Sequence, residues 1–154
     1  MRVTLREYTP NDFEAIWKLD QICFAENIAY SRDEMRMYLA LRSSFCIIAE
    51  VDGTLAGFTI MDHRPSRPGY MVTIDVAPEM RRYGVATALL QEVETRLQRA
   101  GGTAIRLEVA INNQGAIDFY KRHGFRDIGR KPGYYNGQLD ALSMKKELTK
   151  TELS

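Results

Sequence analysis

One segment of the 154-residue chain combines residue types that bind anions. It reads Arg81-Arg82-Tyr83-Gly84-Val85-Ala86-Thr87 and lies between a strand-like run and a long helix-like run. The first turn of a helix presents unpaired N–H groups and the positive end of the helix dipole, and both attract a phosphate. Gly84 and Ala86 would let an anion approach the backbone, while Arg81 and Arg82 add positive charge. The segment predicts a phosphate site; the alternative is a strand-to-helix turn with a purely structural role.

Two common phosphate-binding signatures are missing, which narrows the class of ligand. The sequence has neither the G-x-x-x-x-G-K-S/T pattern of a P-loop nor the G-x-G-x-x-G pattern of a Rossmann or kinase-type loop.

Its 21 basic and 20 acidic residues give a net charge of +1, so no bulk field attracts nucleic acid or an anionic membrane. No apolar run approaches the roughly 20 residues of a spanning helix, and the N-terminus lacks signal-peptide features. We expect a cytoplasmic protein with neither nucleic-acid nor membrane partners.

The cysteines and histidines do not form a metal-binding pattern. Cys23 and Cys46 lack C-x-x-C spacing, which argues against a disulfide scaffold and against a zinc ribbon. His63 and His123 have no third ligand at useful spacing. We therefore expect no metal.

The hydrophobic pattern predicts the elements that must position the anion-binding segment. Alternating and β-branched runs favour strands, apolar residues at helical spacing favour helices, and Asp52-Gly53 is a strong hairpin signal. Ser31 and Glu34 form a capping-box pattern, and Gly101-Gly102 ends the longest helix. The predicted strands are 3–8, 45–51, 54–62, 70–77, 104–110, 125–131 and 139–147; the predicted helices are about 10–23, 31–42, 84–100 and 113–122.

The order of these elements predicts a mixed α/β fold. A strand, helix, strand passage makes a right-handed parallel crossover, so the strands 70–77 and 104–110 should lie side by side. The remaining strands can pair antiparallel. We expect a single domain over residues 1–154, with 148–154 as a flexible polar tail.

Two motifs resemble the GNAT N-acetyltransferase superfamily. The run 76–86 (VAPEMRRYGVA) resembles its acetyl-CoA motif, Q/R-x-x-G-x-G/A, with Ala86 in place of the commoner glycine. The runs 107–109 (LEV) and 112–125 (NNQGAIDFYKRHGF) resemble its second motif. The spacing of Glu108, Asn113 and Tyr120 is similar to that of RimI-type N-terminal acetyltransferases, although those often have arginine where Ala110 stands. The resemblance spans about residues 3–147 and implies a seven-stranded, largely antiparallel sheet with one splayed parallel pair and about four helices.

This resemblance implies acetyl-CoA as co-substrate. The diphosphate of CoA would rest on the N–H groups of residues 82–87, and its pantetheine arm would pair with the strand backbone near Ile74 and Val76. Asn113 matches a cofactor-contacting position, and a helix N-cap is its structural alternative. The implied cofactor-binding residues are Ile74, Val76, Arg81, Arg82, Tyr83, Gly84, Val85, Ala86, Thr87 and Asn113.

Acetyl transfer to an amine needs a base and an acid. Glu108 is the candidate base, acting through water, and Asp75 is its backup; which of them acts stays open. Tyr120 is the candidate acid at the departing sulfur. Structural alternatives are a salt bridge from Glu108 to Arg106 or Lys121 and a core position for Tyr120.

The acceptor is expected to be the α-amine of a protein N-terminus, attacked in a ternary complex. An α-amine with a pKa of about 7.7–8.0 suits a weak carboxylate base better than lysine, at about 10.4. Glu26, Tyr30, Asp75, Tyr134 and Tyr135 are the candidate substrate-binding residues. A ribosomal protein is one candidate partner. The alternatives are a small-amine acetyltransferase (polyamine, amino acid or drug) and a catalytically silent acyl-CoA-binding module, while acyl-chain preference and oligomeric state stay open.

Overall fold

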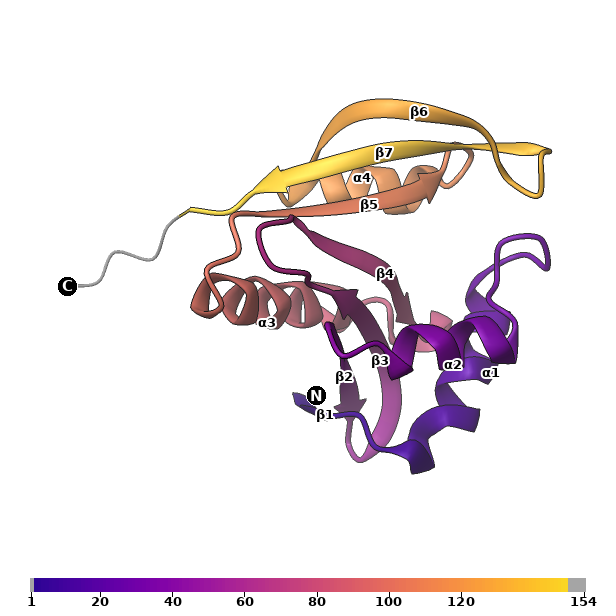
Figure 1. The fold of residues 1–154 in the computed structure, drawn as a ribbon. Helices are drawn as coiled ribbons and strands as arrows, with labels where there is room; N and C mark the ends of the chain where they lie inside the picture. The colour runs from indigo at the N-terminus through magenta and orange to yellow at the C-terminus, as the bar shows by residue number, and fades with distance from the viewer. Residues whose placement is uncertain (1, 150–154) are drawn as a thin grey trace.

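The computed structural model describes residues 2–149, which form a seven-stranded sheet with helices against it (Figure 1). The predicted tail at 148–154 begins too early, because Leu148 is buried and its N–H donates to the Thr103 carbonyl at 2.8 Å; residues 150–154 lie outside the described residues. The elements are β1 (Val3–Glu7), η1 (Pro10–Asp12), α1 (Phe13–Cys23), α2 (Arg32–Ala40), β2 (Ser44–Val51), β3 (Thr54–Asp62), β4 (Gly69–Val76), η2 (Pro78–Met80), α3 (Val85–Arg99), β5 (Ala104–Ala110), α4 (Gln114–Arg122), β6 (Arg126–Tyr135) and β7 (Leu139–Glu147).

The sheet contains one parallel pair, as predicted. Its strand order is β1-β2-β3-β4-β5-β7-β6, and every neighbouring pair except β4 and β5 is antiparallel. β4 and β5 pair only through Gly69 with Ile105 and Tyr70 with Arg106, after which the strands diverge (Figure 1). The fold is therefore the mixed sheet with a splayed parallel pair that the sequence predicts.

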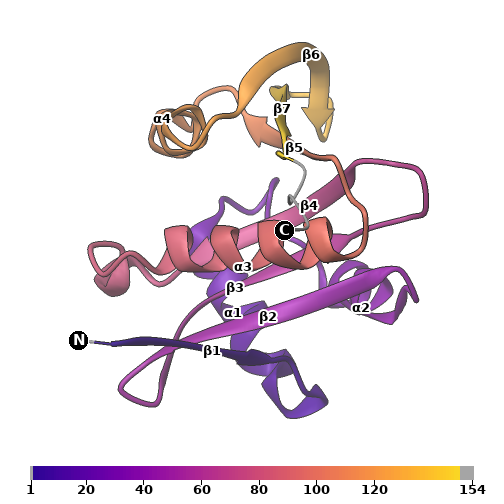
Figure 2. The same cartoon turned by 90° about the vertical axis from the view of Figure 1, so that its left-hand side faces the viewer.

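Two apolar clusters fill the two faces of the sheet. On one face, Leu89, Val93 and Leu97 of α3 pack with Ile117 and Tyr120 of α4. Figure 2 looks onto this arrangement, with α3 crossing in front of β3 and β4, and α4 beside β5, β6 and β7. On the other face, α1 and α2 contribute a second cluster that includes Phe13, Ile16, Leu19 and Met35. Helices therefore pack against both faces of β4.

Local sequence signals correctly place several element ends. Asp52 and Gly53 both have positive φ (52° and 78°), as a tight hairpin turn requires. Ser31 and Glu34 form the predicted capping box at the start of α2. Gly84 has φ 74°, which is not helical, so α3 begins one residue later than the helix predicted at 84–100.

β6 extends beyond its predicted range of 125–131. It continues to Tyr135 with an irregular register after Lys131. The N–H of Gly133 donates a 2.8 Å hydrogen bond to Asp140 Oδ1, which keeps this stretch beside β7. The Gly/Tyr segment that the sequence assigns to a turn is therefore partly strand.

Among residues 2–149, no helix is long and apolar enough to cross a membrane. The cytoplasmic location stays a prediction.

Candidate active site

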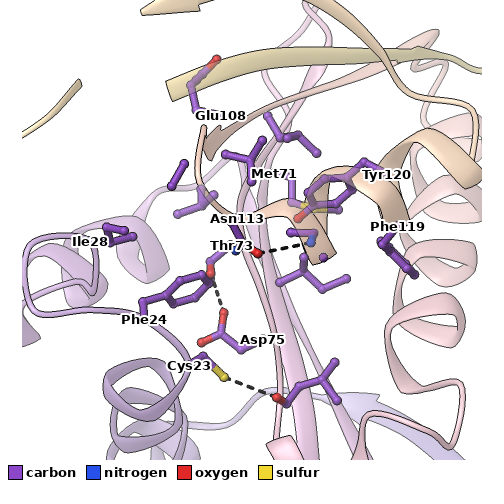
Figure 3. A pocket seen from close by; sticks show the side chains of 18 of the residues that line it. Cys23, Phe24, Ile28, Met71, Thr73, Asp75, Glu108, Asn113, Phe119 and Tyr120 are labelled. Atoms are coloured by element: carbon purple, nitrogen blue, oxygen red, sulfur yellow. Dashed lines mark hydrogen bonds between the residues drawn. The ribbon is translucent and has the colours of Figure 1, made fainter. Parts of the chain in front are cut away.

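A cavity of about 660 Å³ lies where β4 and β5 separate (Figure 3). Its walls come from residues 70–76 of β4, residues 107–110 of β5, the segment after α1, the start of α4 and the end of β6. Because no strand within residues 2–149 pairs with the β5 side of β4 beyond Tyr70, the cavity is bordered by strand backbone as well as by side chains. The splay thus creates both the space and a row of groups that an amide-bearing ligand can pair with.

Ile74 and Val76, the predicted contacts of the pantetheine arm, both line this cavity. The Val76 carbonyl already accepts hydrogen bonds from Arg81 Nε at 3.3 Å and Cys23 Sγ at 3.4 Å. Its lone pairs are therefore engaged before any ligand binds. Arg81, which follows η2, thus contacts both β4 and the end of α1. Its position beside Arg82 in the sequence does not predict this structural role.

The turn before α3 presents free backbone donors. The Ala88 N–H bonds back to the Gly84 carbonyl, and the preceding amides of residues 84–87 have no acceptor among the described residues. A Cβ placed on Gly84 would meet nothing within 4 Å, so the approach to this backbone is open. Arg82 is exposed beside it. These donors, one cation and the adjoining cavity fit a diphosphate joined to an amide-bearing arm.

The predicted cofactor-binding residues divide into two groups. Ile74, Val76, Arg81, Ala86 and Asn113 line the cavity. The others lie in the adjoining turn and α3 outside that lining; they are Arg82, Tyr83, Gly84, Val85 and Thr87. The Val85 side chain is buried in the core, which leaves its backbone N–H as the group able to contact a ligand.

Asn113 is a helix N-cap at the edge of the cavity. Its side-chain oxygen accepts a 3.2 Å hydrogen bond from the Ala116 N–H and so caps α4, and the residue also lines the cavity. Near the other end of α4, His123 Nε2 lies 3.2 Å from Thr87 Oγ1 of α3. The sequence does not predict this contact, which fixes α4 beside the anion-binding turn.

Glu108 lies on β5 with only 3% of its side chain exposed. Ser143 Oγ donates to Oε2 at 2.8 Å, Lys131 Nζ lies 3.5 Å from Oε1, and Arg106 lies 3.9 Å from Oε2. The expected pairing with Arg106 is present. The alternative pairing with Lys121 is wrong, because Lys121 points to Asp127 instead, at 3.8 Å.

Tyr120 lies on α4 and is 8% exposed. Its ring packs edge-on against Phe119 and Phe125, so it is a core aromatic, and it also lines the cavity. Its hydroxyl makes no hydrogen bond within residues 2–149, and burial raises its pKa well above the ordinary value of 10. A protonated phenol therefore borders the cavity without a partner.

Glu108 and Tyr120 reach the cavity from opposite faces of the sheet. Leu107 and Val109 belong to the α3 and α4 cluster together with Tyr120, and strand alternation turns Glu108 to the other face. Figure 3 shows Glu108 and Tyr120 on separate sides of the opening. A reacting carbonyl between them would have a carboxylate on one side and a phenol on the other.

Aromatic side chains border the Glu108 side of the cavity. Tyr30 Oη donates to the Val72 carbonyl at 3.1 Å, Tyr134 and Tyr135 pack at right angles, and the Tyr70 and Tyr134 hydroxyls lie 3.4 Å apart. Glu26 is exposed and lies outside the cavity lining, whereas its neighbours Phe24, Ala25 and Ile28 form part of it. The sequence prediction missed Phe24, Ile28 and Tyr70, although an aromatic and an aliphatic residue beside Glu26 are a usable signal.

Asp75 is fully enclosed at the β4 wall. It is 1% exposed and accepts a hydrogen bond from Thr73 Oγ1. Burial and the neighbouring Asp20 raise its pKa well above the ordinary range for aspartate. This environment disfavours the free carboxylate that a backup base would need.

Known sequences resemble this chain over most of its length. The family model described as "Acetyltransferase (GNAT) family" matches residues 13–125. An N-alpha-acetyltransferase of Saccharolobus solfataricus is 30% identical over 94% of this chain and 93% of its own. An uncharacterized N-acetyltransferase of Methanocaldococcus jannaschii is 28% identical over 93% and 90%.

Solved structures share the architecture. Ard1 from Thermoplasma volcanium superposes with a TM-score of 0.89 at 25% identity, covering 97% of this chain and all of the other (100%). The ribosomal-protein-S18-alanine N-acetyltransferase of Escherichia coli gives a TM-score of 0.86 at 22% identity, covering 99% and 98%, and shows the shared fold.

Proposed function

The chain belongs to the acetyltransferase (GNAT) family, whose members use acetyl-CoA, and from this premise we propose that it acetylates the α-amine of a protein N-terminus. The carrying observation is that Glu108 and Tyr120 border one cavity at the β4–β5 splay from opposite faces. The similarity to an N-alpha-acetyltransferase at 30% identity supports the acceptor class.

The residues for holding acetyl-CoA are those of the open turn and the splayed strand. The amides of residues 84–87 and the Arg82 guanidinium would bind the diphosphate, and β4 beyond Tyr70 would pair with the amide-bearing arm. Asn113 and Ala86 would flank that arm. When bound, acetyl-CoA supplies an acetyl group activated as a thioester.

Glu108 acts as the base on the acceptor side. The amine nitrogen attacks the thioester carbonyl carbon as the carbon–sulfur bond breaks, and Glu108 accepts the proton lost from nitrogen through a water molecule. Lys131 and Ser143 hold the carboxylate in place. An α-amine is neutral in about one molecule in ten at pH 7, whereas neutralising a lysine costs about 4–5 kcal/mol, so this base suits an α-amine.

Tyr120 acts as the acid on the opposite side. Its raised pKa keeps the phenol protonated, and its unpartnered hydroxyl is free to donate to the departing sulfur. The tyrosines at 30, 70, 134 and 135 form the wall along which the first residues of a peptide would lie. A ribosomal protein is one acceptor to include in a test.

The test is thiol release from acetyl-CoA with a panel of acceptors. The panel holds peptides with varied first and second residues, including ribosomal-protein N-termini, and free polyamines, amino acids and amine drugs. A matched peptide with a blocked N-terminus and an internal lysine is the control. We expect the highest kcat/KM for free α-amine peptides, with mass spectrometry locating the acetyl group on the first residue.

Two outcomes would contradict the proposal. Faster turnover of a free small amine than of any peptide would assign the chain to small-molecule acetylation. Tight acetyl-CoA binding without thiol release in the presence of any acceptor would indicate a silent acyl-CoA-binding module.

A further inference from the structure

Asp20 of α1 and Asp75 of β4 form a buried pair that the acetyl-transfer steps do not use. Their exposed fractions are 0% and 1%, and the two carboxyl groups lie within hydrogen-bonding reach of each other. Each has one satisfied oxygen: Asp20 Oδ2 accepts from the Tyr30 N–H at 2.8 Å, and Asp75 Oδ1 accepts from Thr73 Oγ1. The other two oxygens, Asp20 Oδ1 and Asp75 Oδ2, have no partner among the described residues.

A single proton satisfies both of the unpartnered oxygens. Two carboxylates can only accept hydrogen bonds, whereas a carboxylic acid donates one, so one protonated and one ionised group make a mutual bond. Like charges that share a buried site cannot both ionise at moderate cost. The pair therefore holds one proton and one negative charge.

The surrounding groups do not replace that proton. The charged and titratable groups facing the pair are Cys23 of α1, Tyr30 of the following loop, Glu34 of α2, Cys46 of β2, Arg81 after η2 and Tyr120 of α4. Arg81 is the one cation in this set, and its guanidinium bonds the Val76 carbonyl and Cys23 Sγ, not the pair. Burial accordingly raises the pKa of both aspartates.

We propose that Asp20 and Asp75 share one proton in a hydrogen bond that latches the segment after α1 to β4 and so positions the acceptor-binding wall. Asp20 bonds the backbone of Tyr30, and Tyr30 Oη in turn bonds the Val72 carbonyl. Trp17 and Gln21 of α1 both donate to the Tyr30 carbonyl. In Figure 3 the Asp75 carboxyl points toward Phe24 and Cys23, at the end of α1.

The latch joins the two halves of the active site. β4 carries the backbone proposed to hold acetyl-CoA, and Phe24, Ile28 and Tyr30 line the acceptor side. Because the folded-state pKa of each aspartate lies above its unfolded value, the stabilisation is full below the unfolded pKa and is lost progressively as pH rises through the folded pKa. Loss of the proton leaves two buried like charges that push α1, with the Tyr30 backbone that Asp20 holds, away from β4.

Asp20 variants test the latch. Asparagine at position 20 can accept from the Tyr30 N–H and donate to Asp75, but cannot ionise. We expect the acceptor KM of wild type to rise as pH increases through the pKa of the pair, and Asp20→Asn to keep the low acceptor KM without that rise. Asp20→Leu leaves Asp75 Oδ2 and the Tyr30 N–H unpaired, and should raise the acceptor KM about tenfold with an unchanged Kd for acetyl-CoA.

The control is Asp12→Asn, which removes an aspartate paired with Arg6 outside the cavity and should leave both constants and the pH profile unchanged. Acceptor ionisation affects every variant alike, so the comparison isolates the pair. An identical pH profile of the acceptor KM in wild type and Asp20→Asn, or equal KM increases in Asp20→Asn and Asp20→Leu, would overturn the proposal.

The acceptor-side consequence rests on the proposed function, whereas the shared proton does not. Carbon-13 NMR of the aspartate carboxyl groups detects the shared proton without any acceptor present. We expect an aspartate signal in wild type that titrates above the ordinary Asp range and moves to lower pH in Asp20→Asn. Its absence would refute the latch even for an active enzyme, and its presence in a protein that acetylates no peptide would refute only the function.

Discussion

Ser143 and Glu108 stand directly opposite each other on β7 and β5, and the Ser143 hydroxyl donates a 2.8 Å hydrogen bond to Glu108 Oε2. The bond occupies one carboxylate oxygen and leaves Oε1 beside Lys131. Ser143 is buried, so no water can replace its hydroxyl without rearrangement. The orientation of the proposed base therefore depends on a residue of the neighbouring strand.

Replacing Ser143 with alanine should lower kcat/KM by about tenfold. The Glu108 carboxylate loses the hydrogen bond that orients it toward the acceptor. Glu108→Gln should lower kcat/KM by about 10²–10⁴, because the base is lost while the acceptor amine ionises as before. Initial-rate measurements give both answers, and normal turnover of Glu108→Gln would exclude Glu108 as the base.

Tyr120→Phe should lower kcat by about 10²–10⁴ while the Kd for acetyl-CoA stays near wild type. The substitution removes only the unpartnered hydroxyl and keeps the ring packed against Phe119 and Phe125. Tyr8→Phe, a tyrosine that does not line the cavity, is the matched control. Normal turnover of Tyr120→Phe would leave Tyr120 with a packing role alone.

Arg82→Gln should weaken acetyl-CoA binding several-fold. The loss should be larger at low salt, because dissolved ions screen the attraction between an exposed guanidinium and a diphosphate. S-acetylpantetheine lacks the diphosphate, so its KM should be the same for wild type and variant. Arg99→Gln, at the opposite end of α3, serves as the control. Equal losses with both donors would place Arg82 away from the diphosphate.

Gly84→Ala should weaken acetyl-CoA binding and lower the melting temperature by a few degrees. An added Cβ would meet no atom within 4 Å, so a steric clash is not the cause. The cause is the left-handed backbone at φ 74°, which costs an L-residue about 1–2 kcal/mol. Gly129→Ala is matched, because that glycine also has open space but no positive φ. Calorimetry with and without acetyl-CoA measures both effects; equal melting temperatures for the two variants would contradict this account.

The features predictable from sequence are those fixed by neighbouring residues or by chain connectivity. Asp52-Gly53 determines its hairpin locally, and the crossover rule places β4 beside β5. The partner of Glu108 was not predictable in the same way. Lys131 takes the place expected for Lys121 because the irregular register of β6 on β7 brings it there.

The Asp20–Asp75 pair shows the same limit. The two residues are far apart in the sequence, and Asp20 reads simply as part of an amphipathic helix. Only the packing of α1 against β4 brings the carboxyl groups together. Side-chain contacts between non-adjacent elements, such as Thr87 with His123, were likewise missed.

The parallel seam between β4 and β5 consists of two residue pairs. Beyond this seam, β4 would bind acetyl-CoA mainly through main-chain atoms, which side-chain mutations do not remove. The side chains on the acceptor side of the cavity, such as Phe24, Ile28, Tyr134 and Tyr135, do not carry this donor contact. Descendants of one ancestral scaffold can thus diversify in the amines they modify while inheriting the acyl donor unchanged.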